Sequence, residues 1–305
     1  MQRLTRDQTS FYFSADTEPA LEVREGEEFL VETQDAHSGT ITSEAVVYRS
    51  LEEVFERIGG ANPVTGPVAL LGLAAGECMA VELLEVVGAP VTGFGYMCTT
   101  PRLHPDLEPA TVICHRHGDT VHIPDARGGI DVPYQPFIGT LGVAPAAGRI
   151  ESFQQSRAIM GNVDTPEVTT GATVVLRAGV DGGLLALGDA HLVQGDGEIH
   201  RSAIETQADV RLRVRRSDPE GFAELPQVNT ASFLGSVAPG PGHLEDLVRA
   251  AYDDLATRLT RVYGFSLAEA YRLLGAVGEV RVSQVVPPVF AVLAKLPRRY
   301  VGEED

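Results

Sequence analysis

The segment from residue 186 to residue 198 concentrates side chains that could bind a metal ion or transfer protons. It reads Ala-Leu-Gly-Asp-Ala-His-Leu-Val-Gln-Gly-Asp-Gly-Glu, and it places Asp189, His191, Asp196 and Glu198 within ten positions. Asp, Glu and His hold divalent cations in proteins and move protons to and from water. The interspersed glycines let the backbone turn sharply enough for several of these side chains to converge. The segment therefore predicts a functional site, although an acidic, glycine-rich loop between strands can also be only a solvated turn.

Two residues of this segment are candidate metal ligands. Residues two positions apart on an extended strand project to the same face, so Asp189 and His191 could reach one ion. The same spacing recurs at Asp35 and His37, which follow the apolar strand expected at residues 28–31. Two such pairs facing each other across a cavity would supply four ligands for one ion, or ligands for two adjacent ions. The alternative is that Asp189 caps a turn and that His191 only packs against it.

Further carboxylates and amides could transfer protons or bind a substrate. Glu198 is the candidate general acid and base, because a carboxylate beside a cation can take a proton from water and return it to a leaving nitrogen; it could equally be a ligand. Asn162 could donate a hydrogen bond to a carbonyl oxygen as negative charge develops, with Asp164 as a ligand or as the residue that orients the amide. The alternative for this pair is an Asx turn that shapes a loop. Gln194 could hold an amide substrate, whereas Asp196, between two glycines, is typical of a turn or of a calcium ligand.

The acidic segment is part of a wider resemblance to the acetamidase/formamidase family. The segments that match the family in order are Glu32-Thr33-Gln34-Asp35, Asn62-Pro63-Val64-Thr65-Gly66-Pro67, Pro136-Phe137-Ile138-Gly139-Thr140-Leu141-Gly142-Val143-Ala144-Pro145, Met160-Gly161-Asn162-Val163-Asp164 and residues 188–198 with Ala203-Ile204-Glu205. Gln284-Val285-Val286 is similar to the family's closing strand. Met160 stands where the family has glycine, which affects the local backbone and the pocket size. The resemblance includes Asp35 but not His37. It implies hydrolysis of small linear amides to a carboxylate and ammonia, on a β-rich scaffold with a divalent metal.

The choice of a metal-dependent mechanism also rests on residues that the chain lacks. Lys295 is the only lysine, and no serine-rich nucleophile motif lies near it, so amidase mechanisms that need a catalytic lysine are disfavoured. A Gly-x-Ser-x-Gly nucleophile elbow is absent as well. The three cysteines form no Cys-x-x-Cys pair and therefore predict neither a disulfide framework nor a thiolate zinc site. With His and carboxylate as the candidate ligands, we expect zinc, with a nearby calcium ion as a second candidate. A metal- or ligand-binding β module without turnover, or a metallohydrolase of another bond type, would use the same residues.

Periodicity predicts a mainly β protein. Residues 203–214 alternate apolar and polar side chains with the period of a half-buried strand. The apolar runs at 173–176 and 184–187 flank Asp181-Gly182-Gly183, which predicts a hairpin-like turn. We therefore expect a β-sandwich-like domain over residues 1–216 that carries the metal site.

Helix signals are few and gather near the C-terminus. Ser50 and Glu53 form a capping box for a short helix that Gly59 would end. An apolar stripe predicts a long helix over residues 243–263, and Ser266 caps a second helix that reaches about residue 274. A strand is expected at 279–285. These elements predict an α+β C-terminal segment over residues 217–305, with the break near Arg215-Arg216-Ser217-Asp218-Pro219.

Bulk properties limit the partners of the protein. The formal net charge of −18 argues against nucleic acid and against an anionic membrane surface, because both need clustered basic residues. Neither a signal peptide nor a membrane-spanning apolar run is recognisable, so we expect a cytoplasmic protein. His115, His117 and His122 resemble a chelating pattern, but they lie outside the family-like segments, and we expect them to pack or to be solvated. The expected partner is a small amide substrate, and a homo-oligomer, as a dimer, is expected by analogy with β-rich enzymes of this size.

Overall fold

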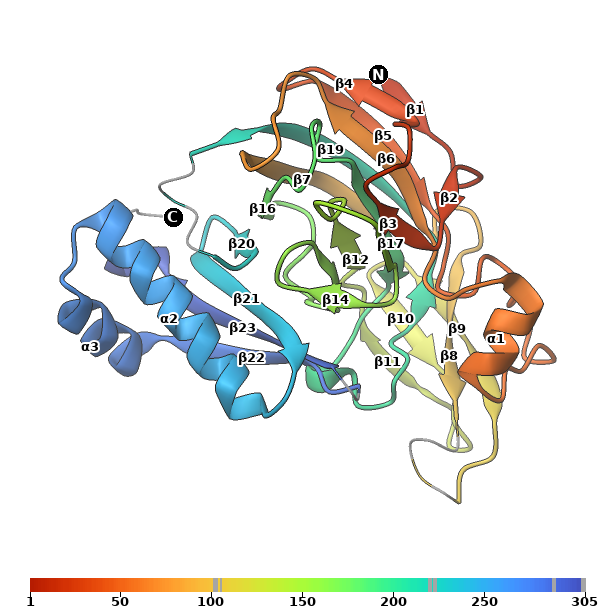
Figure 1. Cartoon of the computed structure of the whole chain (residues 1–305). Helices are drawn as coiled ribbons and strands as arrows, with labels where there is room; N and C mark the ends of the chain where they lie inside the picture. Colours follow the sequence, from red (N-terminus) through yellow and green to blue (C-terminus); the bar gives the residue numbers. More distant parts are fainter. Residues whose placement is uncertain (101–103, 105, 219–220, 222–223, 287–288, 303–305) are drawn as a thin grey trace.

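Two large β-sheets dominate the computed structural model, which describes residues 1–100, 104, 106–218, 221, 224–286 and 289–302 (Figure 1). In spatial order, the nine-stranded sheet consists of β1 (Gln2–Leu4), β5 (Glu28–Thr33), β19 (Ala208–Ser217), β7 (Cys78–Gly88), β16 (Thr173–Arg177), β20 (Gln227–Asn229), β21 (Phe233–Pro241), β23 (Val289–Pro297) and β22 (Glu279–Gln284). The mainly β fold that the sequence predicts is confirmed.

The twelve-stranded sheet carries most of the segments that resemble the family. Its main path runs through β11 (Ile130–Pro133), β10 (Thr120–Ile123), β9 (Ala110–His117), β8 (Phe94–Thr99), β18 (Glu205–Thr206), β17 (Leu185–His191), β12 (Phe137–Gly142), β15 (Met160–Asn162) and β14 (Gln155–Ser156). Off this path, β6 (Val64–Leu70) pairs with β17 and also with β2 (Thr9–Ser10) and β4 (Leu21–Val23). A separate two-stranded sheet contains β3 (Tyr12–Ser14) and β13 (Arg149–Glu151).

The main hydrophobic core lies between these two sheets. Val81 and Val210 enter it from the nine-stranded sheet, and Ile138 and Leu187 enter it from the twelve-stranded sheet. Each of these side chains is fully buried. Along β19 the buried core residues recur at every second position, as the alternation at 203–214 predicts. The body of the protein is thus sandwich-like, since each sheet buries one face against the other.

The turn at Asp181-Gly182-Gly183 does not close the predicted hairpin. Both flanking strands form, but β16 pairs with β7 and β20, whereas β17 pairs with β6, β12 and β18 in the other sheet. Gly182, Gly183 and Leu184 have φ values of 76°, 73° and 51°. Three successive left-handed residues turn the chain out of one sheet and into the other. The hairpin prediction is therefore wrong, because strand propensity does not say which sheet a strand joins.

The three α-helices in the described part of the chain agree with their sequence signals. Ser50 caps α1 (Leu51–Ile58) and Gly59 ends it with φ 86°. The long helix is α2 (Leu244–Tyr263), and the capping box of Ser266 and Glu269 begins α3 (Leu267–Val277). Helix α2 lies against β21 and β23, and α3 lies against α2 and β23; leucines and alanines form a second core there (Figure 1).

Strands on both sides of residue 216 belong to one sheet. Thr173 of β16 is the register partner of Asn229 of β20, so the C-terminal strands continue the nine-stranded sheet. The division at residue 216 into two domains stays a prediction, and Pro219 in the expected break lies outside the described residues.

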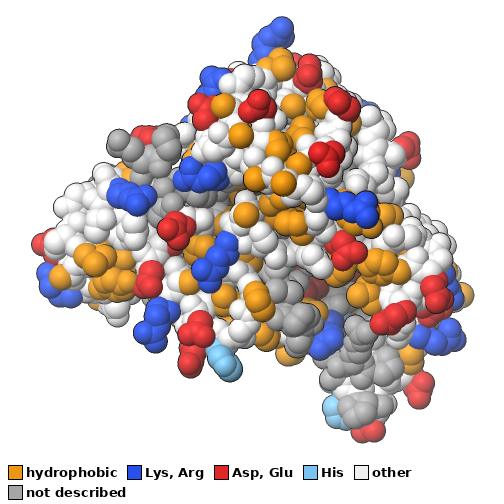
Figure 2. Space-filling view, viewed as in Figure 1, with side chains coloured by type: hydrophobic (Ala, Val, Ile, Leu, Met, Phe, Trp, Pro, Cys, Tyr) orange, Lys and Arg blue, Asp and Glu red, His pale blue; other side chains and the backbone are white. Residues whose placement is uncertain are grey.

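The charge distribution on the surface and the hydropathy of the helices are relevant to the partners that the sequence analysis considers, nucleic acid and membranes. Acidic and basic side chains are intermixed with apolar ones over the face of the molecule shown in Figure 2. Within the described ranges, no helix is long and apolar enough to span a membrane.

Candidate active site

Strand β17 carries Asp189 and His191 into the interior of the protein, where they are 2% and 1% exposed. Asp189 has φ 55°, so the backbone is left-handed here and not extended as the sequence predicts. This conformation is uncommon for a non-glycine residue and costs free energy that the surrounding structure must offset. The Oδ1 atom of Asp189 lies 3.6 Å from Nε2 of His191.

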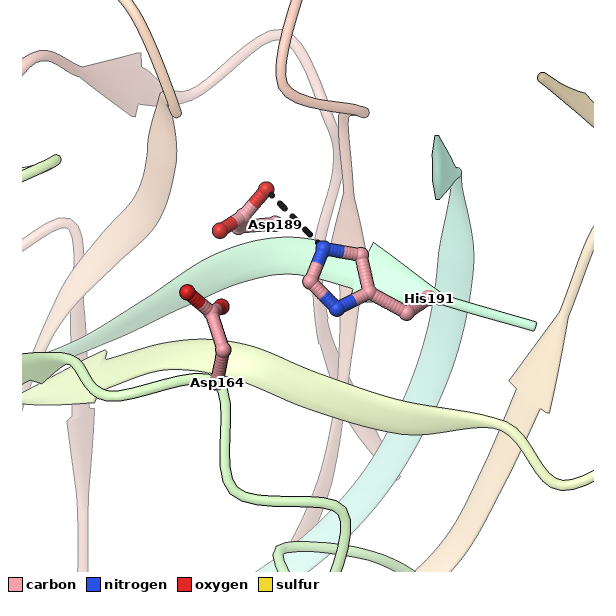
Figure 3. A group of neighbouring side chains, drawn as sticks. All are labelled: Asp164, Asp189 and His191. Atoms are coloured by element: carbon pink, nitrogen blue, oxygen red, sulfur yellow. Dashed lines mark ion pairs between the residues drawn. The ribbon is translucent and has the colours of Figure 1, made fainter. Parts of the chain in front are cut away.

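Carboxylates surround the imidazole of His191. Glu205 Oε2 lies 3.0 Å from Nε2, next to Asp189. The ligand atoms of Asp164, Asp189 and His191 all lie within 4.8 Å of one another, and Figure 3 shows the three side chains converging. His191, Glu198 and Glu205 form a second group within the same limit. We call these five residues the acidic cluster.

Burial changes the proton affinity of the acidic cluster. Burial, followed by the charge of Asp189, raises the pKa of Asp164 to about 7. Burial, followed by the charge of Asp164, raises the pKa of Glu198 well above its usual value, and burial also raises the pKa of Glu205. For His191 burial disfavours the imidazolium, but Glu205 and Asp189 outweigh it and raise the pKa well above 6.5. Ionisable groups with strongly shifted pKa values cluster at active sites.

Nδ1 of His191, a buried atom of the acidic cluster, has no hydrogen-bond partner among the residues the structure describes. An unsatisfied buried polar atom is costly, and several buried carboxylates with one imidazole leave negative charge uncompensated. A divalent cation would supply the missing positive charge, and the donor set of His and carboxylate suits one. The residues of the acidic cluster therefore fit a metal ion.

Neutral side chains hold Asp189 in place. Asn62 Nδ2 donates to Asp189 Oδ2 at 2.7 Å, and the Thr140 hydroxyl lies 3.2 Å from the same oxygen. With its amide nitrogen facing the acids, Asn162 donates to Asp189 Oδ2 at 2.7 Å and to Asp164 Oδ1 at 3.2 Å. The structure thus places Asn162 and Asp164 together, as the sequence suggests, with the Asn162 amide directed at carboxylates.

The C-terminal strand β22 reaches this site from the other sheet. Gln284 donates to the Asp164 carboxylate, and Gln155 Nε2 donates to Gln284 Oε1 at 2.9 Å. The side chain of Gln194, the candidate substrate-binding residue, donates to backbone oxygens of Asp164 at 2.8 Å and of Ser283 at 3.0 Å. The amide nitrogen of Gln194 therefore connects the acidic segment, residues 186–198, to β22 in this structure.

Asp35 and His37 lie beside one another in a separate hydrogen-bond network. Asp35 Oδ1 accepts from the backbone of His37 and of Gly39 and from the Tyr96 hydroxyl at 2.9 Å. Nδ1 of His37 lies 2.9 Å from the same hydroxyl, and the ring stacks on Tyr48. Burial lowers the pKa of His37, although Asp35 and Asp189 oppose the shift. Among the described residues neither ligand group contains this pair, so its role as a ligand stays a prediction.

The sequence assigns no role to one member of the acidic cluster, Glu205, or to three residues that contact the cluster. These three are Asn62, Thr140 and Gln284. All four lie in segments that resemble the family, which is the only signal that could have found them. His115, His117 and His122 lie on β9 and β10, and His122 pairs with Asp131 at 2.9 Å.

Gly139 leaves the space that the cluster needs, and this gives a first prediction. A Cβ atom at this position would overlap Asp164 Oδ1 and would lie 2.8 Å from Asp189 O and 2.9 Å from His191 Cε1. We expect Gly139→Ala to lower kcat/KM by about 100-fold, the cost of a misplacement near 1 Å. The measurement is the rate of hydrolysis of short amides, the activity that the resemblance implies, on protein whose fold is checked by circular dichroism. Gly275→Ala is the matched control, since a Cβ there meets nothing within 4 Å; equal activity of both variants would contradict a tightly packed cluster.

Comparison with known proteins identifies relatives over the whole chain. A model of the acetamidase/formamidase family matches residues 154–299. The structure is similar to an acetamidase from Bacillus halodurans, at 31% identity, with 98% of each chain covered and a TM-score of 0.89. A predicted acetamidase/formamidase from Thermoanaerobacter tengcongensis is 28% identical, with 100% of this chain and 99% of that chain covered and a TM-score of 0.88. An acetamidase from Yersinia enterocolitica is 27% identical, with 98% and 92% covered and a TM-score of 0.87. A search of the curated proteins finds no match.

The similarity spans both sheets, the acidic cluster and the C-terminal helices, since it covers nearly the full length of each structure. The segments of the sequence that resemble the family are the ones that bring Asn62, Thr140, Asp164 and Asp189 together. This chain belongs to the acetamidase/formamidase family and is an amidase.

Proposed function

We propose that the protein hydrolyses short linear amides, of the formamide and acetamide type, to a carboxylate and ammonia with the help of a divalent cation. The observation that carries the proposal is the acidic cluster, in which buried carboxylates meet one histidine whose Nδ1 atom has no partner within the described part of the chain. The alternatives of a binding module without turnover and of a metallohydrolase of another bond type would use the same cluster, and they are outcomes of the test below.

Asp164, Asp189 and His191 would hold the cation, with Glu205 beside Nε2 of His191 as a further candidate ligand. A divalent cation bound there would polarise a water molecule or the amide carbonyl. Zinc suits the mixture of imidazole and carboxylate, and calcium would suit an all-oxygen site nearby. Asp35 and His37 remain candidates for such a nearby site.

The residues of the chain would supply the proton transfers. Glu198, which is 8% exposed and has φ 46°, lies in the acidic segment beside Asp164. Its raised pKa means that it binds a proton more readily than an ordinary carboxylate, which suits a group that takes a proton from water and returns it to the leaving nitrogen. Asn62, Thr140 and Asn162 orient the carboxylates and so fix where charge is held.

The test measures ammonia release from formamide and acetamide by purified protein, together with elemental analysis after extensive dialysis. We expect turnover of at least one of these amides, about one divalent ion per chain, and loss of activity with a chelator that the ion restores. Tight metal binding without ammonia release from any short amide would favour the binding module. Activity on esters or cyclic amides alone would favour another bond type. Activity that is untouched by chelators in protein without metal would contradict the role of the cation.

Removal of the cation should make the stability of the folded state depend on pH. In the metal-free protein Asp164 keeps its proton up to about pH 7, whereas the unfolded chain releases it near its ordinary pKa of 3.8. The folded state then binds more protons than the unfolded state, so the free energy of unfolding falls as the pH rises through this range. The raised pKa values of Glu198, Glu205 and His191 act in the same direction.

The measurement is Tm from pH 5 to pH 8 with and without metal. We expect Tm of the metal-free protein to fall over this range, and a smaller fall with metal bound, because the cation stabilises the charged carboxylates. Asp164→Asn should flatten the metal-free profile. A metal-free Tm that rises with pH would contradict the buried, protonated state of the cluster.

Assembly and location complete the proposal. We propose a homo-oligomer, with a dimer as the simplest case, and a location in the cytoplasm. Size-exclusion chromatography with light scattering measures the first, and fractionation of the native host measures the second.

A further inference from the structure

A cavity of about 540 Å³ lies on the outer face of the nine-stranded sheet. Its floor includes Val175 of β16 and Ala80 of β7, which are register partners. The adjacent pair, Val174 and Val81, points the opposite way into the main core. The nine-stranded sheet therefore lies between the cavity and the main core, and the cavity lining includes no residue of the acidic cluster.

The lining of this cavity is basic, in contrast to the chain as a whole. Among the described residues, Arg215, Arg258 and Arg298 line it with one acidic residue, Asp218, whereas the chain carries a formal charge of −18. Arg215 Nε is bound by the Glu82 carboxylate at 2.5 Å, and Arg298 Nε donates to the backbone oxygen of Thr230 at 2.7 Å. These two guanidinium groups are thus held in place at the cavity.

Arg258 is the buried member of the three, and no carboxylate of the described residues forms an ion pair with it. It is 8% exposed on α2, and burial lowers its pKa to about 10. Nη1 donates to Asn229 Oδ1 at 2.7 Å, while Nε has no acceptor and no ion pair forms within the ranges that the structure describes. A buried charge without a partner is strongly unfavourable, and among the residues that the structure describes an acceptor is lacking at this point.

The nearest acid on the same helix cannot fill this place, because its oxygens are engaged. Asp254 Oδ1 accepts from the backbone of Glu224 at 2.7 Å and of Leu225 at 2.9 Å, and Oδ2 accepts from the Ser236 hydroxyl at 2.7 Å. Asp254 therefore holds the chain before β20 in position. It contributes to the field at Arg258 only at a distance.

We propose that this cavity is an anion-binding site, in which Arg258 binds the oxygens of a small carboxylate or of phosphate. The planar guanidinium presents parallel donors that match both kinds of oxyanion, and such charge-assisted bonds are the strong ones. Arg298 and Arg215 add positive charge around the ligand. The site lies outside the amidase centre and does not depend on the proposed hydrolysis.

The test uses metal-loaded, full-length protein in a chloride buffer at constant ionic strength, with acetate and inorganic phosphate as separate probes. We expect at least one probe to raise Tm with the logarithm of its concentration above Kd, by on the order of 5 °C at a hundredfold excess over Kd. Calorimetry should give an affinity that falls at least tenfold in Arg258→Gln and stays unchanged in Arg249→Gln, which removes the same charge from an exposed position of α2. A response to acetate alone identifies a carboxylate site, and a response to phosphate alone identifies a phosphate site.

A second variant guards against an unstable Arg258→Gln protein. Thr173 lines the cavity and is the register partner of Asn229, so Thr173→Glu brings a carboxylate beside Arg258. We expect this variant to have a higher Tm without added anion and to lose the response to the probes. Ammonia release should persist in both variants, which separates this site from the amidase centre. Equal anion affinity in wild type and Arg258→Gln, or no response of the wild type to either probe, would overturn the proposal.

Discussion

His191→Ala is expected to lose the bound cation and the amidase activity together. Nε2 of His191 is the atom at which the carboxylates of Glu205 and Asp189 converge, at 3.0 Å and 3.6 Å. Without the imidazole, the carboxylates of the acidic cluster face each other with no nitrogen ligand, so the affinity for zinc falls and the negative charge is left uncompensated. Elemental analysis and ammonia release on the same preparation measure both effects.

The control for this variant is His117→Ala, which removes an exposed histidine of β9 and should keep metal and activity. A zinc titration followed by calorimetry extends the test to weak binding. If His191→Ala keeps a full complement of metal and loses only activity, then His191 acts on the substrate and is not a ligand. Full activity would mean that the acidic cluster is a structural feature.

Glu198→Gln is expected to keep the fold and the metal but to lose rate by about 10²–10⁴-fold, the usual contribution of a positioned general acid and base. The amide is close in shape to the carboxylate but cannot accept a proton. Steady-state kinetics should show the loss in kcat. The pH profile of kcat/KM should lose the limb that reports ionisation of Glu198 in the free enzyme.

Metal content distinguishes the two roles that remain open for this residue. Glu198 belongs to a ligand group with His191 and Glu205, so loss of metal in step with activity would identify it as a ligand. Glu56→Gln, an exposed position on α1, is the matched control and should behave as wild type. Unchanged kcat in Glu198→Gln would remove Glu198 from the reaction altogether.

Local signals in the sequence predicted the elements that depend on local physics. The α1 and α3 caps at Ser50 and Ser266, the long α2 helix and the alternation along β19 all appear where the sequence places them. Helix caps and side-chain periodicity involve residues only a few positions apart, so the sequence displays them directly. The prediction of a hairpin at residues 181–183 is wrong because the pairing partners of a strand depend on contacts with strands far away in the sequence.

The site too has features that the sequence displays locally and others that depend on tertiary contacts. Asp189, His191 and Glu198 are neighbours in the sequence, so their chemistry and, with the family-like segments, the amidase family could be inferred from the sequence itself. The tertiary structure decided that Asp164 and Glu205 join them, that Gln284 arrives from the far C-terminal strand, and that Asp35 and His37 meet at Tyr96. It also decided the left-handed backbone at Asp189, whose carbonyl oxygen lies close to Gly139. Convergence of residues more than a hundred positions apart, and strain that tertiary contacts offset, have no local signature in a single sequence.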